Sequence, residues 1–578
     1  MFNKKLVAVA IASAMASMTV IADEMENSSE MSVQDEIVVS GSGISFANNA
    51  ITEGMKSQQT EMTSILSVVD NLPGVNMSEG DQFGGDDWST VISMRGFVTN
   101  LDEQQIGMTI DGLPNGGSNY GGGSKANRYI DSLNSGGVEV SQGTADIASR
   151  SHEALGGTMN FLTDAPAEVE RMRVHNSQGD NDASKYYMRY DTGLIGEDTY
   201  AWVSASSQSA KSWIEESGES NRDHAAAKII SQVGGVELTS YAMIDKTHED
   251  NYQRVSVEQF EENPDWDRLT SEWTGIPYVD QAYRKGWSTL RKNAFAYIKA
   301  DFDAADSISV KTAAYYHKNS GRGDWFPPYM VDTETGSLVY FVDADGNALT
   351  ADSECSSSIT FPYGGAGANY DADCYEEGAI PVSSYRHTHY RKQRWGLTAD
   401  ASMVQQLGET TNTVTAGIWY ENNQRFERRD WHEIIDPSTG YEFDGTPYYE
   451  QYSLEFPTET IKYYIQDEIM VGDLTANLGV KQFLVETTRK DWQQGGAETA
   501  KLNSDSDLLW SAGLVYQLPI DGLEAFAGYA ENFAAIKDST LEDGEDYKDL
   551  EPETAKNYDL GARYFGERFD ATFTLYQT

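Results

Sequence analysis

From about residue 167 onward, the chain consists largely of stretches in which apolar and polar side chains alternate. The clearest of these stretches are 307–316, 474–481 and 571–576. Because successive side chains of a β-strand point to opposite faces, a period of two predicts strands with one apolar and one polar face. A long series of such strands restricts the chain to a large β-sheet architecture.

Connections of two kinds join these stretches. Long polar and aromatic connections, such as 321–346, 352–377 and 429–450, alternate with tight turns. An outer-membrane barrel has short turns at one end and long loops at the other, whereas a soluble β-sandwich does not separate its loops so strictly. We therefore predict a transmembrane β-barrel over residues 167–578. Its tight turns are expected at Leu194–Asp198, Gly234-Gly235, Asp303–Asp306, Leu407–Asn412, Val471–Asp473, Pro519–Gly522 and Gly566–Arg568.

The number of predicted strands leads to an expectation about the completeness of the barrel. The tight turns imply two strands each, and residues 169–175 add one more, so that about 15 strands are present. An open sheet with two unpaired edges cannot remain in lipid, because its edge N–H and C=O groups would lack partners. We therefore expect the sequence to be C-terminally incomplete.

The mean hydropathy of the chain, −0.53, excludes helical membrane proteins but not barrels. The polar side chains that face the lumen keep the hydropathy of a barrel low. After the N-terminal segment, no run approaches the ~20 apolar residues that a membrane-spanning helix needs.

The N-terminal segment has the form of a secretory signal peptide. Two lysines precede an apolar run, and Val20 and Ala22 suit cleavage before Asp23. The run is too short for a membrane-spanning helix. We expect residues 1–22 to be removed on export.

Residues 42–166 have the pattern of a small α+β domain. Apolar residues within 62–69 recur at i, i+3, i+4 and i+7, which predicts one helix that ends before Pro73. Glycine-rich loops separate the following segments, and long loops of this kind are usually functional or mobile. The predicted strands are Thr90–Arg95, Ile106–Asp111, Val138–Gln142 and Thr158–Thr163, and the loops are Glu79–Asp87 and Asn115–Lys125.

A short β-prone run precedes this domain. It follows residues 23–34, which are acidic, rich in Met and Ser, and typical of flexible chain. The run is either an ordinary strand of the next domain, or a strand that adds itself to a partner's sheet edge through backbone hydrogen bonds. It comprises Asp35, Glu36, Ile37, Val38, Val39, Ser40 and Gly41.

The charge of the chain is strongly acidic. Asp+Glu 91 against Lys+Arg 42 gives a net charge of −49. A phosphate backbone requires a basic face, so a nucleic-acid partner is disfavoured. The charge serves either solubility in a salty habitat or acidic outer loops that attract cations.

The two cysteines, Cys355 and Cys374, lie in one polar stretch. In an exported protein such a pair predicts one disulfide. A metal site would need further ligands, and this stretch contains no His.

His387 and His389 place two imidazoles on one strand face, which could hold a metal. Arg386, Arg391 and Lys392 crowd the same segment and disfavour a cation. We therefore expect a barrel-rim or loop role and no metal. The sequence shows no zinc-hydrolase helix, nucleophile elbow or P-loop spacing, so we predict a protein that is not an enzyme and has no cofactor.

Several motifs, in order along the chain, resemble those of TonB-dependent outer-membrane receptors. Asp35–Gly41 resembles their TonB box, and the resemblance extends over essentially the whole mature chain. The motifs that resemble plug motifs are Leu72-Pro73-Gly74-Val75, Ile92–Phe97 (ISMRGF), Thr109–Pro114 (TIDGLP) and Glu153–Thr163 (EALGGTMNFLT), and those that resemble a late-barrel signature are Tyr529–Phe533 (YAENF), Leu550–Glu553 (LEPE) and Asn557–Gly561.

The resemblance implies a barrel of about 22 strands around a plug, and therefore roughly seven further strands. It implies that cargo binds at outer loops and plug apices, that the plug shifts, and that the inner-membrane TonB complex captures Asp35–Gly41 and pulls. The implied partners are TonB, outer-membrane lipid and a small-molecule or glycan cargo, at the cell outer membrane of a Gram-negative bacterium. The expected domains are 1–22 signal peptide, 23–41 leader with the TonB box, 42–166 plug and 167–578 incomplete barrel.

The resemblance also implies a contact between plug and barrel. In the family, plug arginines pair with barrel carboxylates, and Arg95, Glu531 and Asp559 stand at matching positions. We expect Arg95 to latch the plug to one of the two carboxylates; alternatively, it only satisfies plug carbonyls. Gln142 stands where family plugs often carry another arginine, so the latch is expected to be weaker than usual.

Side chains of the plug apices and of one outer loop are candidates for cargo contacts. Aromatic rings provide contact area at low entropic cost. They could equally pack the loops or the membrane interface. The candidates are Gln82, Phe83, Trp88, Asn119, Tyr120, Trp325, Phe326 and Tyr329.

Energised uptake of an iron–siderophore complex is the leading functional prediction, because such complexes are the most frequent cargo of the family. Oligosaccharide, haem and cobalamin are the alternatives within it, and a passive porin or a surface adhesin is the alternative outside it. Acidic loops suit a strongly anionic ferric catecholate poorly, which leaves a neutral siderophore or a glycan open.

Overall fold

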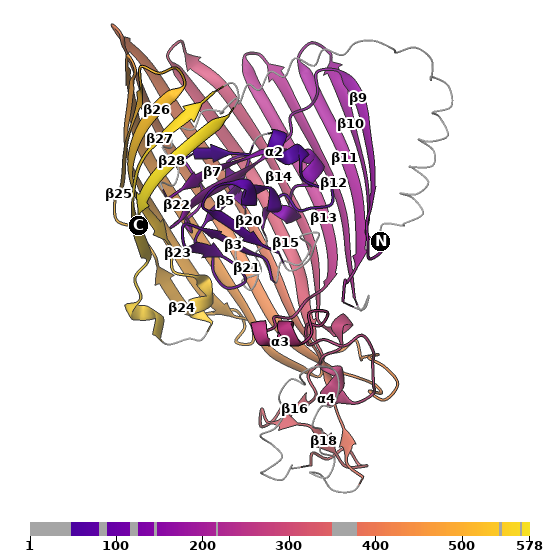
Figure 1. Cartoon of the computed structure of the whole chain (residues 1–578). Coiled ribbons are helices and arrows are strands. Elements are labelled where there is room, and N and C mark those ends of the chain that lie inside the picture. The colour runs from indigo at the N-terminus through magenta and orange to yellow at the C-terminus, as the bar shows by residue number, and fades with distance from the viewer. Residues whose placement is uncertain are drawn as a thin grey trace, which may run out of the picture. The chain divides into compact units, whose positions relative to one another are not determined.

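The alternating stretches after residue 167 form one antiparallel sheet in the computed structural model (Figure 1). The sheet has 16 strands: one continuous order runs from β9 to β28, and β24 pairs with β23 beside it. The structure describes residues 48–51, 53–79, 89–115, 125–143, 147–214, 218–349, 378–542, 546–566 and 569–578. The strands are β9 Glu170–Gln178, β10 Ser184–Ile195, β11 Thr199–Lys211, β12 Glu219–Val233, β13 Val236–Asp250, β14 Ser288–Ala305, β15 Ile308–Trp325, β20 Ser384–Leu407, β21 Thr410–Glu433, β22 Tyr449–Val471, β23 Leu474–Asp491, β24 Ala497–Asn503, β25 Leu509–Gln517, β26 Leu523–Ala534, β27 Glu553–Phe565 and β28 Asp570–Gln577.

The six predicted tight turns that lie within the described residues each join two neighbouring strands of this sheet, which confirms the barrel pattern; Gly566–Arg568 lies partly outside the described residues. The continuous order from β9 to β28 contains 15 strands, as predicted, and the described residues show no pairing between β9 and β28 themselves. The long connections lie at the opposite strand ends and carry short elements of their own (Figure 1). These elements are α3 Val257–Glu262, α4 Pro277–Asp280, η4 Arg284–Gly286, β16 Met330–Val331, β17 Leu338–Val339, β18 Phe341–Val342, β19 Ile380–Pro381, η6 Asp538–Leu541 and η7 Asp546–Asp549.

The two faces of the sheet differ as the alternation predicts. In β11, Trp202 is fully buried while the next residue, Val203, is 55% exposed. In β27, Asp559 is buried while Leu560 is 59% exposed. The apolar outer face suits a lipid environment, and the inner face carries polar groups. Among the described residues, no helix combines the length and the apolar composition needed to cross a membrane.

The N-terminal domain contains two small sheets, with strand orders β1-β7-β8-β5-β6 and β2-β3-β4. The four predicted strands are confirmed as β3, β5, β7 and β8. The elements are β1 Asn48–Ala50, α2 Glu53–Ser57, η1 Ser67–Asn71, β2 Val75–Ser78, β3 Val91–Met94, β4 Phe97–Thr99, β5 Gly107–Ile110, β6 Leu113–Asn115, η2 Ala126–Arg128, η3 Ser132–Asn134, β7 Ser135–Gln142 and β8 Gly157–Thr163.

The prediction of a helix over residues 62–69 is wrong. This segment consists of turns followed by the 3-10 helix η1, although its apolar side chains are buried as the pattern requires. The Ser64 hydroxyl accepts hydrogen bonds from the backbone N–H groups of Leu66 and Ser67, and the Thr60 hydroxyl accepts one from Met62. Hydroxyl groups that bond to the nearby backbone compete with regular helix.

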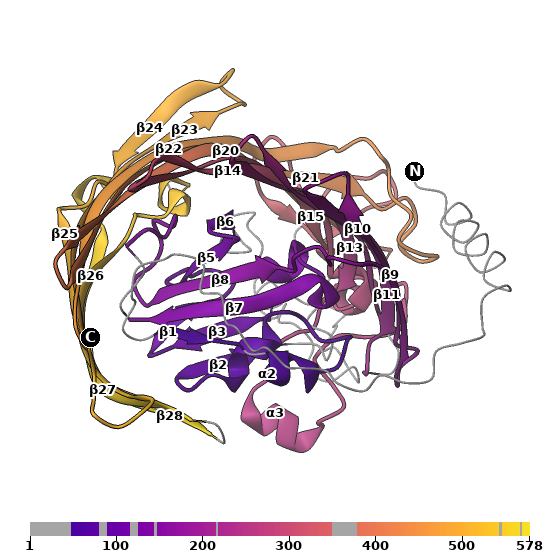
Figure 2. The same cartoon turned by 90° about the horizontal axis from the view of Figure 1, so that it is seen from above.

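The N-terminal domain lies within the curve of the large sheet, as the view along the barrel shows (Figure 2). One apolar cluster is continuous between them: it includes Ile92, Val140 and Phe161 of the small domain, and Trp202 and Phe295 of the barrel wall. The small domain therefore packs against the inner face of the barrel.

Candidate functional site

The candidate site is the interface between the N-terminal domain and the barrel wall. At β10 and β11, the carboxylate of Asp131 accepts hydrogen bonds from the Lys185 ammonium at 2.9 Å and from the Ser206 hydroxyl at 2.6 Å. Asp131 is only 2% exposed and Lys185 only 3%. Although burial opposes ionisation, Lys185 and the nearby Arg222 hold the pKa of Asp131 well below its usual range. A buried, ionised pair therefore joins the small domain to this wall.

Asp111 lies in the turn between β5 and β6 and forms a second contact of this kind. Its carboxylate accepts hydrogen bonds from the Tyr297 hydroxyl at 2.7 Å and from Thr163 at 2.6 Å. The Lys299 ammonium binds its carbonyl oxygen, and Lys228 donates to the Thr163 carbonyl at 2.9 Å. Burial would raise the pKa of Asp111, but Lys228 and Lys299 outweigh it and lower that pKa.

The N-terminal domain also carries a buried arginine on this side. Arg128 of η2 donates to Glu249 of β13 at 2.7 Å, and both side chains are buried. Asn134 donates to the Ser204 hydroxyl at 2.8 Å and accepts from the Tyr187 hydroxyl at 2.7 Å. Charged and polar groups of several strands, β10 to β14, thus hold one side of the domain.

On the other side, Arg95 pairs with Asp559 of β27 at 2.6 Å. The guanidinium also lies 4.4 Å from the ring centre of Tyr576 in β28. Arg95 occupies the turn between β3 and β4 with a φ of 52°, a left-handed conformation. A Cβ atom at Gly143 would approach the guanidinium to 2.7 Å, so this glycine makes room for the contact.

Glu531, the other candidate carboxylate of the latch, and Gln142 make different contacts. Glu531 accepts hydrogen bonds from the Tyr529 hydroxyl at 2.6 Å and from the backbone N–H of Trp510 at 3.0 Å, both within the barrel wall. Gln142 donates to the Pro73 carbonyl at 2.7 Å, inside the N-terminal domain. Of the two candidate carboxylates, Asp559 is therefore the one that Arg95 contacts.

Next to this pair, backbone groups connect the two parts directly. Ala154 donates its N–H to the Phe533 carbonyl at 3.2 Å, and Ala535 donates to the His152 carbonyl at 2.8 Å. The Asn532 amide donates to the carbonyls of Gly143 and Leu155. This side of the interface resembles the edge of a sheet more than a cluster of charges.

The predicted cargo contacts are only partly placed. Trp325 lies under the guanidinium of Arg386, 4.7 Å from its ring centre, and Tyr329 packs on Tyr340 and Trp431. Phe326 is 1% exposed and packs on Tyr385 at 4.4 Å between ring centres, so it belongs to the core of the outer loops. Several predicted site residues lie outside the described part of the chain: Gln82, Phe83, Trp88, Asn119 and Tyr120, the run Asp35–Gly41, and the cysteines Cys355 and Cys374.

Two of the positively charged neighbours of His387 and His389 contact aromatic rings. Arg386 stacks on Trp325, and Arg391 lies 5.1 Å from the ring centre of Phe426. The two histidines instead meet Asp430 of β21.

Sequence reasoning missed the contacts of the β10–β14 side, including Asp131, Lys185, Lys228 and Glu249. A usable signal exists: a charged side chain in the middle of a membrane-barrel strand must face the lumen. The signal identifies Lys185 and Lys228 as inward-facing, but their partners depend on how the small domain is oriented.

A small domain fixed inside a large antiparallel sheet by buried polar contacts defines a plugged membrane barrel. The model "TonB-dependent Receptor Plug Domain" matches residues 43–158, and the model "TonB dependent receptor-like, beta-barrel" matches residues 243–578. The chain belongs to the TonB-dependent receptors, a family of transport receptors whose barrels sit in the Gram-negative outer membrane. We therefore call the N-terminal domain the plug.

Solved structures share this fold. The unliganded ferric citrate transporter FecA has a TM-score of 0.68 and 15% identity, and the match covers 92% of this chain and 69% of that one. The siderophore receptor PiuA from Acinetobacter baumannii has a TM-score of 0.63 and 14% identity, with coverage of 92% and 71%. The ferric-catecholate import receptor Fiu from E. coli K12 has a TM-score of 0.61 and 13% identity, with coverage of 93% and 75%. No curated protein matches the sequence.

Proposed function

We propose that the protein imports a ferric siderophore across the outer membrane with energy that TonB delivers to the plug. Family membership supports the coupling to TonB, and several proteins of similar fold are ferric siderophore receptors. The observation that carries the proposal is the plug–barrel interface. Buried pairs such as Lys185–Asp131 close the lumen, so work is needed to open it.

In this proposal, residues 1–22 direct export and Asp35–Gly41 bind TonB. A strand paired edge-on with a partner sheet can bear a pulling load through its backbone hydrogen bonds. The pull would reach the plug and break the contact of Arg95 with Asp559, which acts as the latch. Cys355 and Cys374 would form a disulfide that fixes an outer loop.

The charge of the outer loops favours a neutral siderophore over a strongly anionic one. Asp332 and Asp343 lie in the exposed connection that follows β15. A backbone hydrogen bond from Thr335 lowers the pKa of Asp332, and a hydrogen bond from the Asn347 side chain lowers that of Asp343, so both stay ionised at neutral pH. Carboxylates at the entrance repel an anionic complex. Trp325 and Tyr329 are the described aromatic candidates for contact with such a cargo.

Deletion of Asp35–Gly41 tests the proposal. Cells that express this variant should bind iron-loaded neutral hydroxamate siderophore as the wild type does but should no longer accumulate the iron. Replacement of residues 25–31 is the matched control and should leave accumulation unchanged. Accumulation that survives the deletion would indicate a passive porin, and binding without accumulation in the wild type would indicate an adhesin. Growth of a deletion strain on iron, haem, cobalamin and glycan sources identifies the cargo class.

A further inference from the structure

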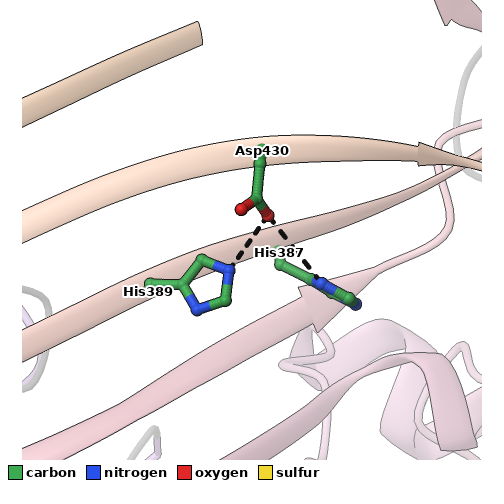
Figure 3. A group of neighbouring side chains, drawn as sticks. All are labelled: His387, His389 and Asp430. Atoms are coloured by element: carbon green, nitrogen blue, oxygen red, sulfur yellow. Dashed lines mark hydrogen bonds and ion pairs between the residues drawn. The ribbon is translucent and has the colours of Figure 1, made fainter. Parts of the chain in front are cut away.

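Three neighbouring strands bring a group of histidines and aspartates together on the outer face of the barrel. In the pairing registers, His387 lies opposite Asp324 on one side and opposite Asp430 on the other. His389 and His432 occupy neighbouring positions of the same face, as Figure 3 shows for His389. The group lies where β15 and β21 lead into long loops and where β20 begins.

The alternation of β20 places this group outside the lumen. The register of β20 with β21 is unbroken from Ser384 to Leu407. His387 and His389 therefore share a face with Trp395 and Leu397, which are 45% and 52% exposed on the outer side of the barrel. The group is thus separate from the plug interface and from a route for cargo.

The carboxylate oxygen Oδ1 of Asp430 is the centre of the group. The distances to it are 3.0 Å from His389 Nε2, 3.4 Å from His432 Nε2 and 3.8 Å from His387 Nδ1. In a tetrahedral zinc site with bonds of about 2.0–2.2 Å, two donor atoms lie about 3.4 Å apart. The observed distances bracket this value.

The hydrogen bonds of the imidazoles leave nitrogen lone pairs in the group. His432 Nδ1 lies 2.7 Å from the Asp444 carbonyl, which can only accept, so Nδ1 carries the hydrogen. Its Nε2 faces the Asp430 carboxylate at 3.4 Å and is the nitrogen that can offer a lone pair to a cation. His387 is 2% exposed; its Nδ1 faces Asp430 at 3.8 Å, and its Nε2, which has no hydrogen-bond partner in the described structure, lies 4.0 Å from Asp324. A cation among these atoms would turn lone-pair repulsion into coordination.

The group is surrounded by an aromatic ring and by two guanidinium groups, those of Arg428 and of Arg322, which pairs with Asp324 at 3.0 Å. Phe443 packs on His387 and His432, with 5.3 Å between ring centres in both cases, and covers the group from the loop that follows β21. Arg428 binds the other oxygen of Asp430 at 2.9 Å. That contact orients the carboxylate but also places a positive charge near the site, so it weakens the binding of a cation.

We propose that His387, His389 and Asp430, whose ligand atoms all lie within 4.8 Å of one another, bind one divalent transition cation of the zinc type, and that a small shift of the His432 ring supplies a fourth ligand from its place beside Asp430. Neutral imidazole and carboxylate are the donors that zinc prefers. Through His432 and its bond to Asp444, the bound ion fastens the loop after β21 to the outer wall of the barrel. The role of the ion is structural, and the site does not depend on the identity of the cargo.

The test is metal binding by the untagged full chain in detergent micelles. After treatment with a chelator and dialysis against zinc, elemental analysis should find one zinc per wild-type chain. The double variant His387→Gln/His389→Gln should bind zinc at least ~100-fold more weakly, since the loss of supporting partners alone typically costs 10–100-fold. His248→Gln is the matched control. His248 belongs to β13, outside this group, and its Nε2 lies 3.4 Å from Asp250. The His248→Gln variant should therefore bind zinc as the wild type does.

Arg428→Gln supplies a second readout that does not depend on the loss of ligands. Removal of its charge should increase the zinc affinity by about tenfold, since Arg428 repels a cation next to Asp430. Wild-type protein without bound zinc, or a double variant that retains it, would overturn the proposal. An Arg428→Gln variant with unchanged zinc affinity would also count against it.

Discussion

The plug meets the barrel wall in two different ways on its two sides. Toward β10–β14, buried charged side chains make the contacts, such as Asp131 with Lys185 and Arg128 with Glu249. Toward β26–β27, backbone groups near His152 and Phe533 contribute contacts, together with the buried ion pair of Arg95 with Asp559 and the pair of Lys537 with Glu103, whose side chains are 38% and 39% exposed. The β10–β14 side thus depends on buried charge pairs. The β26–β27 side depends more on backbone hydrogen bonds, which water can replace.

This difference suggests an order of opening. When a buried ion pair separates, its charges lose their partners in an environment with little water. Backbone groups that open toward a water-filled lumen, in contrast, form hydrogen bonds with water immediately. We therefore expect the plug to part from β26–β27 first and to stay attached to β10–β14 for longer. Hydrogen–deuterium exchange on both sides of the plug would show this order directly.

Asp131→Ala should produce the largest effect. It leaves the buried ammonium of Lys185 without its carboxylate, which should destabilise plug docking by about 3–5 kcal/mol. The measurement is hydrogen–deuterium exchange of residues 126–142 in micelles, where faster exchange reports the lost docking energy.

Lys311→Ala is the control for this prediction. Lys311 pairs with Asp301, but the two side chains are 52% and 42% exposed. Exposed pairs contribute about 0–1 kcal/mol, so exchange within the plug should stay unchanged. Equal effects of the two variants would contradict the view that charges anchor this side.

Arg95→Ala and Asp559→Ala should each destabilise docking by about 2–3 kcal/mol. This cost lies below the usual cost of breaking a buried pair, because Arg95 and Asp559 share one hydrogen bond. The double variant should show a coupling of at least about 1 kcal/mol. Arg95→Ala with Glu531→Ala is the matched cycle and should show no coupling, because Glu531 binds Tyr529 and Trp510 instead. Coupling of Arg95 to Glu531 but not to Asp559 would remove the latch as described.

The sequence predicts the barrel well because alternation and tight turns are local properties. The helix over 62–69 failed for an equally local reason, the hydroxyl groups that bond to its backbone. Glu531 could be excluded only with the structure, because burial shows that its neighbour Asn532 faces the plug and that Glu531 therefore points the other way. The partners of Lys185 and Lys228 could not be predicted, since they depend on how two separately encoded parts fit together.

The smallest effect concerns His152, whose carbonyl binds Ala535 after β26 while its ring stacks on Trp419 of β21. Burial lowers the pKa of His152 to about 4, and Lys392 and Arg394 act in the same direction. The docked histidine is therefore neutral, while a released one with a pKa near 6.5 gains a proton as the pH falls below that value.

Docking should thus be unaffected by His152 above pH 6.5 and should weaken between pH 6.5 and 4. For a fully buried ring, the docking free energy would decrease by about 1.4 kcal/mol for each pH unit below 6.5. Because the ring is partly exposed, we expect a decrease of about 1 kcal/mol at about pH 5.5. His152→Gln keeps the shape and polarity but cannot titrate, so the difference between its exchange rates and those of the wild type isolates this one group. Identical pH profiles of the two proteins would mean that the charge of His152 is the same in the docked and in the released plug. Acid would then not weaken docking through this residue.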